Sequence, residues 1–81
     1  MIDSATTSND VLSDTYRIAT DAVTVLEPLR SLFALSVRYG YPLARGNAYE
    51  FLGALNNMLG FATELKIESL ALLEDRGVSP K

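Results

Sequence analysis

The sequence predicts an all-α protein in the form of an antiparallel hairpin of two long amphipathic helices. Apolar residues recur at alternating steps of three and four over residues 10–39 and again over 48–76, which is the spacing of one helix face. Glycine and proline residues gather between these ranges, over 40–47, and again after residue 76, where they are typical of helix ends. We expect two such hairpins to pair as a dimeric four-helix bundle.

The composition excludes several kinds of site. The chain has 81 residues, which allows one small domain with a marginal core. It contains no cysteine and no histidine, so disulfides and Cys/His metal sites are impossible, and the usual general base and strongest nucleophile are missing. No Asp-rich loop of the calcium-binding kind is present. We therefore expect no enzymatic activity, no metal and no cofactor.

The charge pattern bears on partners and location. The formal net charge of −3 argues against direct nucleic-acid binding, which needs a basic surface. Residues 28–49 carry Arg30, Arg38 and Arg45 and no acid, so the middle of the chain is locally cationic. There is no basic segment followed by an apolar stretch at the N-terminus, and no apolar run is long enough to span a membrane. We expect a cytoplasmic protein without a membrane partner.

The first predicted helix covers residues 10–39 and follows a small, polar segment over 1–9 that we expect to be a disordered tail. Ser8, Asn9 or Asp10 can cap the helix. Its apolar residues form adjacent columns at a spacing of seven, with polar residues on the opposite side. The first two columns are Val11, Ile18, Val25, Leu32 and Tyr39, and Leu12, Ala19, Leu26 and Phe33.

Pro28 lies in the middle of this helix, where proline removes a backbone hydrogen bond. It shares a column with Asp14 and Asp21 and therefore falls on the solvent side. The apolar columns continue through it without a change of phase, which favours one helix kinked at Pro28. The alternative is a new helix that begins at Pro28 and gives a three-helix unit.

The second helix is predicted over residues 48–76, after a turn at 40–47. Asn47 and Glu50 have the spacing of a capping box, although that motif prefers Ser or Thr at the cap. Gly77, followed by Val78 and Pro80, is a well-formed stop and begins a short C-terminal tail over 77–81.

The apolar stripe on each helix is wider than one neighbouring helix can cover. We expect a lone hairpin to leave part of it in water, and exposed apolar area of that size marks an association surface. Pairing of two hairpins would bury it. The residues assigned to this dimer core are Leu12, Leu26, Phe33, Leu52, Leu59 and Leu73.

Two further groups of residues are candidate binding sites. The glycine groove is a side of the second helix where small residues would let a partner helix approach closely, or where surface glycines are merely tolerated. The tip cluster combines arginine and tyrosine at the hairpin turn, where it would bind an anion or seal the bundle end. The glycine groove comprises Gly53, Asn56, Asn57, Gly60 and Phe61, and the tip cluster comprises Arg38, Tyr39, Tyr41, Arg45, Asn47 and Tyr49.

These features favour a small non-enzymatic protein-binding module, an adaptor, chaperone or inhibitor, that acts as a helical homodimer and binds another protein. One alternative is a binder of an anionic small molecule or nucleotide at the tip cluster. Another is a purely structural, self-assembling bundle. The polar segment over 1–9 could also serve as a partner-binding arm.

Overall fold

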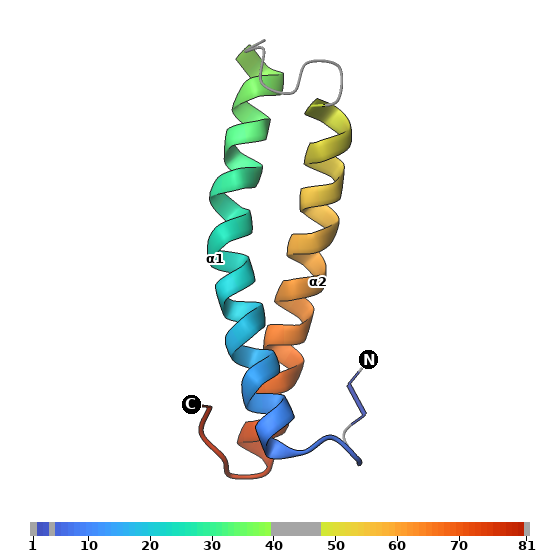
Figure 1. Cartoon of the computed structure of the whole chain (residues 1–81), viewed down its shortest axis with the longest axis vertical. Coiled ribbons are helices and arrows are strands. Elements are labelled where there is room, and N and C mark those ends of the chain that lie inside the picture. Colours follow the sequence, from blue (N-terminus) through green and yellow to red (C-terminus); the bar gives the residue numbers. More distant parts are fainter. Residues whose placement is uncertain (1, 4, 40–47, 81) are drawn as a thin grey trace.

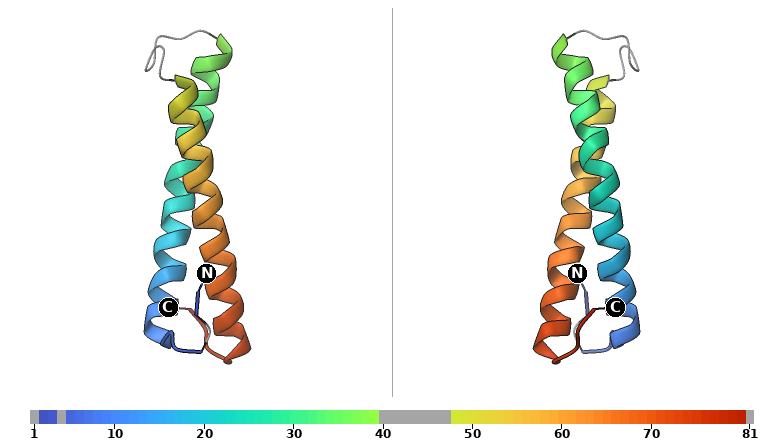
Figure 2. Two further views of the ribbon diagram at one scale, coloured as in Figure 1. Left: turned by 90° about the vertical axis from the view of Figure 1, so that its right-hand side faces the viewer. Right: turned by 90° about the vertical axis from the view of Figure 1, so that its left-hand side faces the viewer.

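The protein is an antiparallel pair of helices, which confirms the predicted all-α hairpin (Figure 1). The computed structural model describes residues 2, 3, 5–39 and 48–80. Within them, α1 runs over Asn9–Tyr39 and α2 over Ala48–Asp75. The molecule measures 49 × 20 × 14 Å, and views from its two sides show that the helices form a single layer (Figure 2). Both chain termini lie at the end where α1 begins and α2 ends.

Helix α1 begins with a capped first turn and continues through its proline. Of the three possible caps, Ser8 takes the role: its side-chain oxygen accepts a hydrogen bond from the Val11 amide (3.3 Å), and its carbonyl accepts one from Leu12 (3.0 Å). Pro28 lies inside the helix and is exposed. The chain therefore does not divide at this residue, and the alternative of a separate helix beginning there is wrong.

Helix α2 ends in the motif that its sequence predicts. Gly77 has a φ of 71°, in the left-handed region where glycine carries no steric penalty. Its amide donates to the carbonyl of Glu74 (3.0 Å), and the Val78 amide donates to the carbonyl of Leu73 (2.9 Å). These two bonds are those of a Schellman motif, which satisfies carbonyls left unpaired at a helix end.

A narrow apolar seam joins the two helices. Among the described residues, six apolar side chains are buried: Leu12, Ala19, Leu55, Leu59, Ala62 and Leu73. The Phe33 and Phe51 rings meet towards the turn end of the seam, with centroids 5.6 Å apart. Ser69 is fully buried, and its hydroxyl donates to the carbonyl of Leu65 (2.6 Å), which removes the cost of an unpaired buried donor.

Contacts also close the end of the hairpin that carries the termini. The Arg76 guanidinium donates to the carbonyl of Thr7 (2.7 Å) and to the side-chain oxygen of Asn9 (2.9 Å), so the end of α2 is tied to the start of α1. Asp3 accepts a hydrogen bond from the Ala5 amide (2.9 Å). That bond, with a smaller contribution from the Thr6 side chain, lowers the pKa of the Asp3 carboxyl below its ordinary value. Part of the segment expected to be a disordered tail thus makes hydrogen bonds.

Neither helix, over the ranges described above, combines the length and the apolarity that crossing a membrane requires.

Candidate functional site: an exposed apolar face

One broad side of the hairpin exposes large apolar side chains along its length. On α1 the column at seven-residue spacing is more exposed than buried at almost every position, with exposed fractions of 50 to 58%. Leu29 lies between two of its members, one helical turn from each. The α1 part of the face, which we call the apolar strip, comprises Val11, Ile18, Val25, Leu29, Leu32 and Tyr39.

Helix α2 adds three side chains to the same face. Met58 and Phe61 line a groove together with Ile18 of the strip, so these residues share one side of the molecule. Phe51 lies two helical turns before Met58 and is half exposed although it contacts Phe33. The strip with Phe51, Met58 and Phe61 is hereafter the apolar face.

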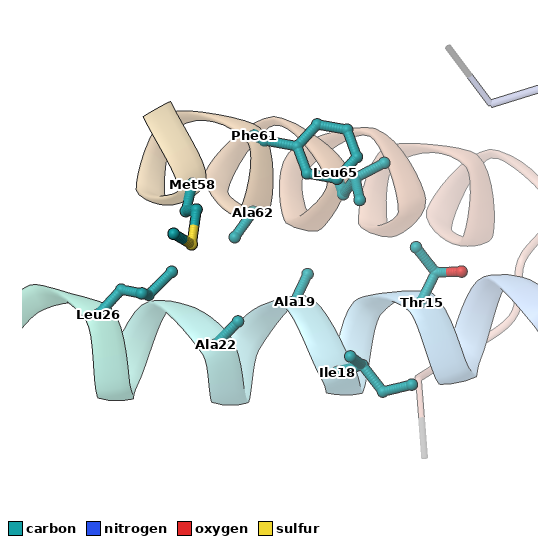
Figure 3. Close-up of a pocket in the computed structure, with 9 residues that line it drawn as sticks. All are labelled: Thr15, Ile18, Ala19, Ala22, Leu26, Met58, Phe61, Ala62 and Leu65. Atoms are coloured by element: carbon teal, nitrogen blue, oxygen red, sulfur yellow. The ribbon is translucent and has the colours of Figure 1, made fainter. Parts of the chain in front are cut away.

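An open inter-helix groove of about 420 Å³ lies in the apolar face, in the half nearer the termini. Figure 3 shows Ala19 and Ala22 of α1 pointing towards α2, and Ala62 pointing back, so small side chains separate the helices here. Larger side chains form the walls. The remaining lining residues are Thr15, Ile18, Leu26, Met58, Phe61 and Leu65. Apart from the Thr15 hydroxyl, which donates to the carbonyl of Val11 (2.7 Å), the lining side chains are apolar, so the groove suits an apolar occupant.

The structure corrects part of the expected dimer core. Leu12 and Leu73 are 0% exposed and Leu59 is 8% exposed in the single hairpin, so the expectation that a lone hairpin leaves them in water is wrong. They occupy the seam, where the facing helix covers them. Leu26, Phe33 and Leu52 are half-buried at the edges of the seam. On α1, most of the large apolar side chains that remain exposed belong instead to the neighbouring column, which includes Val11, Ile18 and Val25.

The residues of the predicted glycine groove do not form one surface. Phe61 lines the inter-helix groove, but Gly53, Asn56, Asn57 and Gly60 do not. A Cβ atom added at either glycine would meet no heavy atom within 4 Å. Both glycines and both asparagines are exposed. Together they form an open, mostly polar side of α2 with no wall beside it.

The tip cluster is described in part. Arg38 and Tyr39 at the end of α1 are exposed, and the Arg38 guanidinium carbon lies 5.4 Å from the Tyr39 ring centroid, a cation–π distance. Tyr49 in the first turn of α2 is exposed as well. The other three predicted members, Tyr41, Arg45 and Asn47, lie outside the described residues. Over the rest of the chain, no group of three acidic, cysteine or histidine side chains is placed to hold a metal ion.

The sequence contained a signal for which column of α1 is buried against α2. The column that includes Leu12 and Ala19 lies near the middle of the apolar stripe of α1, and the column that includes Val11 lies at its edge. Alanine at residues 19, 22 and 62 lets the helices approach each other, which marks the seam. When a single helix covers an apolar stripe, it buries the middle of the stripe before the edge.

Comparison with known proteins gave no match among protein families, curated proteins or solved structures.

Proposed function

We propose that the protein is a small, non-enzymatic protein-binding module that works as a homodimer, in which two hairpins join through their apolar faces as a four-helix bundle. The observation that carries this proposal is the apolar face. Its nine large side chains, each roughly half exposed, present on the order of 800 Å² of apolar surface, which is about the area that each partner buries in a standard interface. Among the described residues, which form a single layer of two helices, nothing covers this face.

This proposal ranks above anion binding at the tip cluster because the exposed apolar side chains extend along both helices, well beyond the tip cluster, with which they share Tyr39. A bundle of two layers would also supply the larger apolar core that a lone hairpin lacks. The six apolar side chains buried among the described residues make a small core for a helix pair of this length. Burial of the apolar face would add about 25 cal/mol for each Å² removed from water. We propose further that Pro28 bends α1 away from straight, on the exposed side of the helix.

Sedimentation equilibrium tests the dimer directly. The wild-type chain should show twice the chain mass, and Val25→Asp should not, because it places a charge in the middle of the apolar strip. Thr24→Asp is the matched control: it makes a similar change of shape and the same change of charge one residue earlier, at an exposed position on the polar side. A Val25→Asp chain that remains dimeric, or a wild-type chain that is monomeric at high concentration, would overturn the proposal.

Binding of another protein would use a side that the bundle leaves open. Gly53, Asn56, Asn57 and Gly60 lie outside the apolar face and would remain accessible in the dimer. Co-purification from the native host, with identification by mass spectrometry, would supply the partner. Gly60→Leu should then abolish binding by its bulk, with little dependence on salt, and Gly60→Ala serves as the smaller control. Undiminished binding by Gly60→Leu would place the partner elsewhere on the molecule.

A further inference from the structure

The inter-helix groove has the dimensions of a site for a short helix. Its lining on α1 extends from Thr15 to Leu26, about 17 Å at 1.5 Å per residue. About three turns of a partner helix cover that length and present apolar side chains three, four and seven residues apart. Ala19 and Ala22 line the groove with small side chains, so a partner helix can approach closely (Figure 3). The groove therefore suits the apolar side of an amphipathic helix.

Exposed acids border the groove on both helices. Asp21 follows Ile18 of the α1 wall by three residues, and Glu64 stands in the same relation to Phe61 of the α2 wall. Each acid therefore lies about one helical turn beyond a lining side chain. Neither carboxylate forms an ion pair with another described residue. A helix seated in the groove would have an unpaired negative charge on each side.

The other charged residues around the groove leave this acidity in place. Arg17 forms an ion pair with Asp14 (3.6 Å), so these two residues offset each other. Lys66 follows the buried Leu59 by seven residues and therefore lies on the seam side of α2, away from the border of the groove. Glu68 lies one turn further along the α2 border and adds another acid.

The excess of acids extends over the whole half of the hairpin nearer the termini. Residues 9–26 and 58–76, the terminal half, carry seven acids and three bases. Residues 27–39 and 48–57, the tip half, carry two of each. Over these described ranges, a second copy therefore offers no half with an excess of bases, whichever half it places on the groove. Contact with a second copy leaves the negative charge of the terminal half unmatched, while a basic partner matches it.

We infer that the groove binds a basic amphipathic helix of another protein, which takes the place of the second copy on the apolar face. This helix carries lysine or arginine on both flanks of its apolar side, because acids border the groove on both α1 and α2. The inference rests on the proposed protein-binding function and adds a kind of partner and its site, apart from the side of α2 that carries Gly60. Binding of the helix and of the second copy is then mutually exclusive.

Two synthetic peptides test the inference on the full chain. The first is a helix of about 18 residues with leucine at alternating steps of three and four and lysine on both flanks, and the second carries glutamate in place of every lysine. Fluorescence anisotropy of the labelled peptides measures the dissociation constants. The basic peptide should bind at least about tenfold more tightly than the acidic one, and added salt should weaken its binding. Sedimentation should then show one chain with one basic peptide.

Substitutions at the border locate the peptide. Asp21→Asn combined with Glu64→Gln should weaken binding of the basic peptide on the order of fivefold to tenfold, through loss of two partly exposed charge contacts. Glu27→Gln combined with Glu74→Gln is the matched control, since it changes the net charge by the same amount at exposed positions that do not line the groove. The control should leave binding within about twofold of the wild-type value.

A change of bulk in the groove provides a second test that does not depend on charge. Ala22→Leu fills part of the groove and should weaken binding of the basic peptide at least about tenfold. Ala34→Leu is the matched control, because residue 34 is exposed and does not line the groove. Circular dichroism confirms that each variant remains helical.

Selective binding of the basic peptide, weakened by the border and groove variants but not by their controls, supports the inference. Equal binding of both peptides, or no binding of either, overturns it. Undiminished binding by Ala22→Leu also overturns it, because the peptide would then lie on another surface. Sedimentation of the chain alone tests the proposed homodimer separately. Twice the chain mass without peptide binding overturns only the inference, whereas a monomer mass with selective binding of the basic peptide overturns only the homodimer.

Discussion

The seam and the apolar face contain the same kinds of residue, but the side chains of the seam are buried and those of the apolar face are exposed. Leu12 is 0% exposed and its neighbour in the chain, Val11, is 53% exposed. The difference comes from position alone, since Leu12 lies under the facing helix and Val11 lies one column to the side. Apolarity therefore shows that a helix will bury a surface, while the position of the next helix decides which part is buried within the hairpin and which part stays exposed.

The largest expected effect distinguishes the seam from the exposed surface by how much stability is lost when a side chain is shortened. Leu73→Ala removes a fully buried seam side chain and should lower the free energy of unfolding by about 3 kcal/mol, since a cavity remains behind. Leu35→Ala, at a position 44% exposed beside the strip, is the matched control and should cost about 1 kcal/mol or less. Urea unfolding followed by circular dichroism measures both. Equal losses would show that the seam is not the core of the hairpin.

A second prediction concerns Pro28, which belongs to neither the seam nor the apolar face. Pro28 is exposed, and proline inside a helix removes a backbone hydrogen bond. Pro28→Ala should therefore raise the free energy of unfolding by about 1 to 3 kcal/mol and leave the sedimentation mass unchanged. Marked destabilisation, or a change of mass, would mean that the proline shapes a surface on which the assembly depends.

The helix ends could be predicted because they depend on local chemistry. The hydroxyl of Ser8 accepts a first-turn amide whatever packs nearby, and the left-handed conformation of Gly77 stops α2 for a reason contained in one residue. The expectation that a lone hairpin leaves Leu12, Leu59 and Leu73 in water was wrong because it required the rotation of each helix about its axis. That rotation is set by the other helix, through small side chains such as Ala19 and Ala62 that permit close approach.

The candidate site was predicted in outline only. A stripe too wide for one neighbour is visible in the spacing of apolar residues, so an exposed apolar surface could be expected. The inter-helix groove could not, because it arises where side chains from α1 and α2 leave space between alanines. For the same reason Phe61, grouped by sequence with Gly60, belongs to a different side of the molecule.

The glycines of α2 provide a smaller test of what is exposed. A methyl group added at Gly53 or Gly60 meets no heavy atom within 4 Å, so only the intrinsic helix preference should change. Each glycine-to-alanine substitution should raise the free energy of unfolding by about 1 kcal/mol. The same urea measurement applies. Destabilisation at either position would reveal a close contact in the assembly that the single hairpin does not contain.

The smallest expected effect lies in the N-terminal turn, outside both regions. The Ala5 amide holds the pKa of the Asp3 carboxyl below its ordinary value of 3.8. The ionised carboxylate therefore stabilises the turn above that pH, and this contribution is lost as the pH falls through the lowered pKa. NMR titration of Asp3 should give a pKa below 3.8 in the wild-type chain. Ala5→Pro removes the amide donor and should raise that pKa; an unchanged value would show that the bond is absent in solution.

The central claim is that the seam folds each hairpin while the apolar face joins two of them, and the concentration dependence of urea unfolding tests it most directly. For a dimer that unfolds to two chains, each tenfold rise in protein concentration stabilises the folded state by about 1.4 kcal/mol, so the wild-type midpoint should move to higher urea. The midpoint of Thr24→Asp should move in the same way, and that of Val25→Asp should be lower and independent of concentration. A wild-type midpoint that does not change with concentration would contradict the claim.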